Sequence, residues 1–156
     1  MKILFLMRHG QSPTAAEAGV ASDALRPLSE QGREDVRRMA LEIVKRGGRP
    51  RILLHSPLTR ALQTAAAAAE ALQPAEGTFV FPPLDNTRPP DEVLGELTAR
   101  ASRVEEVLAV GHQPQVGEIA ALLTGSLYDI RPGGIVAVET GKSPRLLWTL
   151  NPEELR

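Results

Sequence analysis

The 156-residue sequence contains no cysteine, and this absence excludes several kinds of chemistry at once. Without thiols the chain cannot form disulfides, use a thiolate nucleophile or bind zinc through sulfur. A chain without cysteine also fits a reducing compartment. The sequence likewise lacks a cleavable signal segment and any apolar run of membrane-spanning length. We therefore expect a cytoplasmic protein with no membrane contact.

An excess of charge of one sign is also missing, since the formal net charge is -1 at pH 7. Proteins that bind nucleic acid normally carry a basic excess, so we expect no nucleic-acid partner. Hydrophobic residues make up 42% of the chain and charged residues 24%, as in ordinary globular proteins. The length is typical of one domain, and we expect residues 1–156 to form a single domain.

Short apolar runs alternate with segments of helical periodicity along most of the chain. Buried strands are predicted at residues 3–6, 52–55, 78–81 and 107–110, and an alternating terminal hairpin at residues 135–139 and 145–150. A helix follows each of the first four strands. Such crossovers predict the α/β class: a three-layer α/β/α sandwich with a mostly parallel sheet and an antiparallel strand at or near one edge.

Capping residues predict where three of these helices begin. Ser29 and Asp91 are placed to cap the first and third helices, and Ser56 the second, with Pro57 at its first helical position. Four prolines within residues 82–90 predict an irregular segment between the third strand and its helix.

Residues suited to chemistry follow three separate strands. Arg8 and His9 leave the first strand, Arg60 lies in the first helical turn after the second, and His112 follows the fourth. Because the carboxyl ends of parallel strands meet at one edge of a sheet, these side chains are predicted to lie together. Two arginines, two histidines and nearby helix N-termini would form an electropositive site that suits a phosphoryl group.

The predicted geometry gives Arg60 and His9 specific roles in this site. Helical side chains lean toward the helix N-terminus, so the guanidinium of Arg60 is expected to point back at the strand ends. A neutral imidazole of His9, held by one hydrogen bond at Nδ1, would leave its other nitrogen free to attack phosphorus.

The motifs at the strand ends resemble those of a known family. They are Arg8-His9-Gly10 after the first strand, Ser56-Pro57 with Arg60-Ala61 and Gln63-Thr64 after the second, and Gly111-His112 after the fourth. This ordered set resembles the histidine phosphatase superfamily, also known as the phosphoglycerate mutase-like fold. Two longer motifs, Arg26-Pro27-Leu28-Ser29 with Gly32 and Val110-Gly111-His112-Gln113-Pro114, are most similar to the small SixA-type phosphohistidine phosphatases.

The resemblance implies a role for each matching residue. His9 is expected to be the phosphorylated nucleophile. Arg8, Arg60 and His112 are expected to bind phosphate and stabilise its transfer, and Arg26 to be a further phosphate ligand. The resemblance implies no metal and no cofactor.

One segment departs from the family pattern. Larger members carry a glutamate followed by glycine after the third strand as the general acid, whereas this chain has Asp85, Asn86 and Thr87 there. Asp85 is the candidate acid, although a turn residue is the simpler interpretation. An alkoxide leaving group needs a proton in the transition state, whereas a phosphohistidine imidazole can be protonated beforehand. A weak acid therefore favours a phosphoramidate substrate, and the short segment favours an open site that admits a residue of another protein.

Several functions remain open at this point. The first is hydrolysis of phosphohistidine on a signalling or phosphocarrier protein by a monomeric enzyme. The second is a metal-free phosphomonoesterase acting on a small phosphorylated metabolite, with mutase activity less favoured. The third is a non-catalytic module that binds phosphate, and the fourth a metallohydrolase using His9, His112 and Asp85. His55 is expected to be structural.

Overall fold

The computed structural model describes residues 1–156 and is built on one six-stranded sheet in the order β3-β2-β4-β1-β5-β6. The strands are β1 Ile3–Arg8, β2 Ile52–His55, β3 Thr78–Val80, β4 Glu106–Gly111, β5 Ile135–Glu139 and β6 Arg145–Leu150. The first four are parallel, whereas β5 runs antiparallel to β1 and to β6. The predicted class, the mostly parallel sheet and the antiparallel strand near an edge are confirmed.

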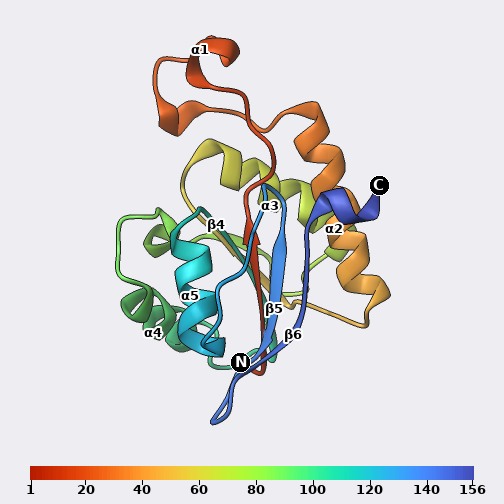
Figure 1. Ribbon diagram of the computed structural model, residues 1–156, viewed down its shortest axis with the longest axis vertical. Coiled ribbons are helices and arrows are strands. Elements are labelled where there is room, and N and C mark those ends of the chain that lie inside the picture. The colour runs from red at the N-terminus through yellow and green to blue at the C-terminus, as the bar shows by residue number, and fades with distance from the viewer.

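Helices cover both faces of the sheet (Figure 1). The α-helices are α1 Ala15–Ala18, α2 Glu30–Lys45, α3 Thr59–Leu72, α4 Pro90–Arg100 and α5 Gln115–Thr124, and the 3-10 helices are η1 Asp23–Leu25, η2 Pro82–Leu84 and η3 Pro152–Leu155. α2 and α3 pack on one face, and α4 and α5 on the other. No helix is both long and apolar enough to span a membrane.

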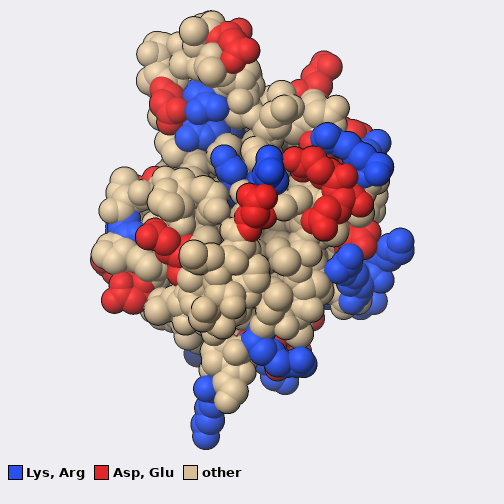
Figure 2. Space-filling model, viewed as in Figure 1, with Lys and Arg blue, Asp and Glu red and all other residues tan.

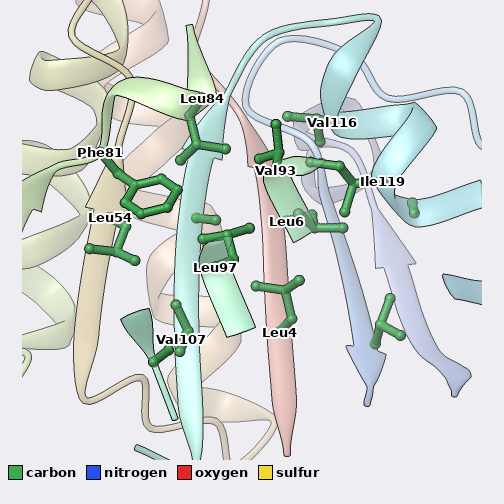
Figure 3. Packing of buried hydrophobic residues seen from close by; sticks show 14 of the residues in the cluster. Leu4, Leu6, Leu54, Phe81, Leu84, Val93, Leu97, Val107, Val116 and Ile119 are labelled. Carbon is green, nitrogen blue, oxygen red and sulfur yellow. The ribbon is translucent and has the colours of Figure 1, made fainter. Parts of the chain in front are cut away.

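Alternation along each strand produces a separate hydrophobic core on each face of the sheet. In β1, Leu4 and Leu6 pack toward α4 and α5 (Figure 3). Phe5 and Met7 pack toward α2 and α3 on the opposite face. Successive side chains of a strand point to opposite faces of the sheet, and both faces are buried here. The strands are therefore apolar at every position and not only at every second one. The sheet is therefore held from both sides, which fixes the ends of its strands.

The alanines of α3 allow a close approach to the sheet. Ala61, Ala65 and Ala68 are completely buried beneath the helix, in the same core as Val36 and Met39 of α2. Small side chains bring the helix backbone near its neighbours, which positions the first turn of α3 relative to the end of β2.

The predicted start of α3 is wrong. The helix begins at Thr59 with Leu58 as its N-cap, so Pro57 is not its first residue and Ser56 does not cap it. The hydroxyl of Ser56 is fully buried and hydrogen-bonds to His112 instead, accepting only the Leu58 backbone N–H locally. The tertiary contact with His112 therefore occupies the Ser56 hydroxyl, which the local sequence predicted to cap the helix.

Two further local expectations need correction. α4 begins at Pro90 with Pro89 as its N-cap, because proline suits the first helical position, and Asp91 lies inside the first turn. Within the proline-rich segment, residues Pro82–Leu84 form the 3-10 helix η2. Proline fixes φ near the value that such a turn requires, so it favours this turn rather than excluding it.

The segment between β1 and α2 stands clear of the sheet (Figure 1). We call residues 13–25 the arm; it contains α1 and η1. Thr14 and Glu17 cap α1 reciprocally, since each side chain hydrogen-bonds to the other residue's backbone N–H. The arm projects beyond the end of the sheet at which β1, β2 and β4 terminate.

The start of α2 packs tightly against the loop that follows β1. A Cβ on Gly32 would overlap the carbonyl oxygen of Gln11 and lie 2.9 Å from its backbone nitrogen, whereas a Cβ on Gly95 of α4 would meet nothing within 4 Å. Gly32→Ala should lower the free energy of unfolding by about 1–3 kcal/mol through overpacking.

The matched control, Gly95→Ala, should raise the free energy of unfolding by about 0.5–1 kcal/mol because alanine favours a helix over glycine. Urea denaturation of both variants measures the two changes. Equal stability of Gly32→Ala and the wild type would contradict the tight contact.

Candidate active site

Backbone hydrogen bonds continue past the ends of three strands and bring the predicted site residues together. β4 lies between β2 and β1 in the sheet. His9 N–H donates to Gly111 O at 2.9 Å, and Ser56 N–H donates to Val110 O at 3.0 Å. The segments after β1 and β2 therefore flank His112, and the rings of His9 and His112 have centroids 5.1 Å apart.

His9 is held in one tautomer by its own loop. The ring is buried, and Nδ1 lies 2.7 Å from the carbonyl oxygen of Gly10. A carbonyl can only accept, so Nδ1 carries the proton and the Nε2 lone pair is free. Gly10 is fixed in turn, because its N–H donates to Thr64 Oγ1, which donates to the carbonyl of Arg60.

His112 is fixed through its Nε2 atom. Nε2 lies 2.7 Å from Ser56 Oγ, and that hydroxyl accepts the Leu58 backbone N–H. The other ring nitrogen, Nδ1, is buried and has no hydrogen-bond partner within the protein. If the hydroxyl hydrogen is donated to Nε2, the proton of the neutral ring is on Nδ1, which is then an unused donor.

Arg8 presents a second unused donor. Its Nη1 donates to the carbonyl of Ile130 at 3.0 Å, whereas its Nε is buried without a partner. Burial lowers the pKa of Arg8, opposed by the charge of Asp129, although a guanidinium remains charged in proteins. Buried polar atoms are rarely unpaired, so Arg8 Nε and His112 Nδ1 are exceptions that a role in the site would explain.

The guanidinium of Arg60 lies close enough to His9 and His112 for its charge to lower the pKa of both rings. It is buried and donates to Asp23 of the arm through Nη1 and Nη2. Arg26 donates to Pro13 O and Ser12 O, and pairs with Asp23. Arg26 therefore ties the arm to the loop after β1, and its guanidinium already has three partners.

Asp85 lies at the edge of the group and is held in a turn. Its Oδ1 accepts the backbone N–H and the hydroxyl of Thr87, as the simpler sequence interpretation predicts. The segment is anchored to α5 by Gln115, which is buried and whose Nε2 donates to the carbonyls of Pro83 and Arg88. The carboxylate is close enough for its charge to raise the pKa of His112.

Burial and positive neighbours keep both site histidines neutral. Burial is the largest cause that lowers the pKa of His9 to about 3, and the charges of His112, Arg60 and Arg8 add to it. Burial likewise lowers the pKa of His112 to about 4, with help from Arg60 and against the carboxylates of Asp23 and Asp85. A neutral His9 keeps its lone pair available at neutral pH, as a nucleophile requires.

No group of three or more His, Asp or Glu side chains lies close enough to hold a metal ion, so His9, His112 and Asp85 do not form one. Figure 2 shows basic and acidic side chains mixed over the upper part of the molecule, without a wide area of one sign.

His55 is buried at the end of β2, and its Nδ1 lies 2.8 Å from the carbonyl of Ser56.

Three residues in contact with this group were not expected from residue type and spacing. Ser56 holds His112, Thr64 links the loop after His9 to α3, and Asp23 binds Arg60. The family motifs include Ser56 and Thr64, which was the available signal for these two. Asp23 had no signal, because it lies 37 residues before Arg60 in a segment of small residues.

The depressed pKa values predict an unusual titration. Between pH 8 and pH 5 the ring signals of His9 and His112 in NMR spectra should stay constant, because their pKa values are about 3 and about 4. The same rings in the unfolded chain bind protons near pH 6.5, so stability should fall as the pH drops from about 6.5 toward these values. A His9 midpoint near pH 6.5 would contradict the buried, neutral site.

Comparison with known proteins agrees with this geometry. The family model described as the histidine phosphatase superfamily (branch 1) matches residues 4–79. An uncharacterised protein of Picosynechococcus sp. is 32% identical over 147 residues, covering 88% of this chain and 85% of that protein. Phosphohistidine phosphatase SixA of Escherichia coli is 28% identical over 158 residues, covering 98% of this chain and 96% of SixA.

A solved structure extends the similarity to the whole fold. The protein histidine phosphatase SixA in complex with tungstate superposes with a TM-score of 0.89 at 28% identity, covering 99% of each chain. The strand order, the residues at the strand ends and these similarities lead to one conclusion. The chain is a phosphatase that belongs to the histidine phosphatase superfamily and is of the SixA type.

Proposed function

We propose that this phosphatase hydrolyses phosphohistidine on another protein through a covalent phosphohistidine on His9. One observation carries the proposal. A buried, neutral His9 with a free Nε2 lies beside His112, whose Nδ1 is buried and unpaired, and within reach of the charge of Arg8, whose Nε is also buried and unpaired. This arrangement supports a nucleophile next to a binding site for phosphoryl oxygens.

In the first step the Nε2 lone pair of His9 attacks phosphorus. The new P–N bond forms as the P–N bond of the substrate breaks, and the bonding electron pair leaves with the substrate imidazole. That imidazole departs as a neutral ring if its other nitrogen is already protonated. Arg8, Arg60 and His112 stabilise the charge on the transferring phosphoryl oxygens, and Gly10 O accepts a hydrogen bond from the Nδ1–H of the phosphorylated His9 ring.

In the second step water attacks the phosphoryl group on His9. The oxygen of water bonds to phosphorus, the P–Nε2 bond breaks and its electron pair returns to His9. One proton of the water stays on the phosphate and the other is released to solvent, so that neutral His9 and inorganic phosphate are formed. The low pKa of His9 makes the neutral imidazole the stable product within the site.

The segment after β3 favours a phosphoramidate substrate. Asp85 is the candidate general acid, but its Oδ1 already accepts two hydrogen bonds from Thr87. A carboxylate oxygen that is held in its own turn is poorly placed to donate a proton to an alkoxide. A protonated phosphohistidine needs no such donor, so this site suits it better than a sugar phosphate.

The proposed partner is a phosphorylated protein. SixA of Escherichia coli is named as a phosphohistidine phosphatase and its similarity covers nearly the whole chain, which supports a phosphorylated protein as substrate. A phosphomonoesterase acting on a small metabolite is the alternative within the family. Arg26 as an additional phosphate ligand, independence of metals and cofactors, a monomeric state and a cytoplasmic location stay predictions.

The covalent step can be trapped on His9. Brief reaction with phosphoimidazole or a phosphohistidine protein, followed by alkaline quenching and mass spectrometry, should place an acid-labile phosphoryl group on His9. His9→Ala should lose at least about a thousandfold in kcat/KM because the nucleophile is gone.

Circular dichroism of His9→Ala serves as the control for folding. Unchanged activity of this folded variant would eliminate His9 as the nucleophile. Activity that is lost in chelator and restored by zinc would instead favour a metallohydrolase, and phosphate binding without turnover would favour a non-catalytic module.

The proposed substrate class predicts opposite behaviour toward two leaving groups. The wild type should turn over a phosphohistidine protein at least about tenfold faster in kcat/KM than sugar phosphates, because only the alkoxide needs an acid. Asp85→Asn should lower the residual phosphomonoester activity at least about tenfold but change phosphohistidine turnover less than about twofold.

Asp91→Asn is the matched control, since Asp91 is an exposed carboxylate in the first turn of α4. It should change neither activity. Faster turnover of sugar phosphates by the wild type, or equal losses on both substrates in Asp85→Asn, would refute the preference for phosphohistidine.

A further inference from the structure

The guanidinium of Arg60 is held by a single residue of the arm. Nη1 donates to the carbonyl oxygen of Asp23 at 2.9 Å, and Nη2 donates to Asp23 Oδ2 at 3.1 Å. The Arg60 side chain is only 9% exposed, whereas that of Asp23 is 65% exposed. Asp23 therefore contacts the buried guanidinium from the solvent side through both its backbone and its side chain.

Asp23 is itself fixed to the loop that follows the nucleophile. Its Oδ1 accepts from Arg26 Nη1 at 3.0 Å. Arg26 also donates from Nε to Pro13 O at 2.8 Å and from Nη2 to Ser12 O at 3.2 Å. Hydrogen bonds thus run from the loop after His9 through Arg26 and Asp23 to Arg60.

Three N–H groups of Arg60 remain available despite these contacts. A guanidinium has five N–H donors, and Asp23 takes one from each Nη nitrogen. The Nε–H and one N–H on each Nη nitrogen are not used by Asp23. Asp23 and a phosphoryl group can therefore bind Arg60 at the same time through different edges.

We propose that Asp23 is the positioning residue for Arg60, holding its guanidinium in the orientation that stabilises the transferring phosphoryl group. An arginine side chain loses rotamer entropy when it is ordered, and Asp23 supplies that order before substrate binds. A preorganised donor is worth most in the transition state, where its geometry must be accurate. This role rests on the proposed function of Arg60 as a phosphate ligand.

A competing role for Asp23 leads to the opposite result. The hydrogen bonds and charges of Arg26 and Arg60 lower the pKa of Asp23, so that its carboxylate is ionised at neutral pH. An ionised carboxylate could act mainly as a competitor that repels phosphate from Arg60. Removing a competitor tightens phosphate binding, whereas removing a positioning residue weakens it.

A double-mutant cycle of Asp23→Ala and Arg60→Ala tests the proposal, because it isolates coupling between the two side chains. Asp23→Ala alone should lower kcat/KM for phosphoimidazole about tenfold, mainly through kcat, and weaken binding of inorganic phosphate measured by calorimetry. In the Arg60→Ala background, the same change should alter either quantity less than about twofold. Equal losses in both backgrounds, or tighter phosphate binding by Asp23→Ala, would overturn the proposal.

Glu17→Gln is the matched control on the same arm. It removes a carboxylate that contacts only its own capping box, and glutamine preserves that box. This variant should keep wild-type kinetics. If Glu17→Gln lost as much kcat/KM as Asp23→Ala, removal of any negative charge from the arm would have the same effect, and the proposal would be overturned. If the wild type binds phosphate but hydrolyses nothing, the proposed function fails while the binding cycle still measures the effect of Asp23 on Arg60. A wild type that binds no phosphate would overturn both.

Discussion

The structure of this site depends on burying an electropositive group of side chains at the edge of the sheet. His9, Arg60 and His112 are buried and Arg8 is partly buried beside them, with carboxylates only at the margin. The protein tolerates this because both imidazoles are neutral and because the arginines donate to protein oxygens, including the carbonyls of Ile130 and Asp23. Two buried nitrogen atoms, Arg8 Nε and His112 Nδ1, have no hydrogen-bond partner within the protein.

The fold creates this group through strand order more than through local conformation. β4 lies between β1 and β2, so the backbone bonds of His9 and Ser56 to the end of β4 place both next to His112. The two hydrophobic cores hold these strands from both faces. The chemistry therefore depends on residues that lie far apart in the sequence but at the same end of neighbouring strands.

Strands, helices and the shared edge were predictable because each follows from periodicity and from the rule for parallel connections. The partners of the site residues were not. Ser56 has the sequence context of a helix cap, but His112 takes its hydroxyl, and no local pattern can anticipate that competition. Asp23 lies in a segment without periodicity, so its contact with Arg60 exists only through the tertiary path of the arm.

The site explains how one family scaffold can favour one leaving group. In the proposed mechanism, His9 as nucleophile and the donors of Arg8, Arg60 and His112 would act on any phosphoryl group, whereas the proton donor alone distinguishes an alkoxide from an imidazole. In this chain that donor position is held by Asp85, in a segment anchored to α5 through Gln115. The proposed preference for phosphohistidine therefore rests on the placement of Asp85 and not on an additional recognition element.

The central claim is that the buried unpaired donors beside His9 bind the transferring phosphoryl group. A crystal structure with orthovanadate, which adopts the geometry of phosphoryl transfer, tests it most directly. The account predicts vanadium bonded to His9 Nε2, with vanadate oxygens accepting from Arg8 Nε and His112 Nδ1. Vanadate bound elsewhere, or bound near His9 with both donors still unpaired, would contradict it.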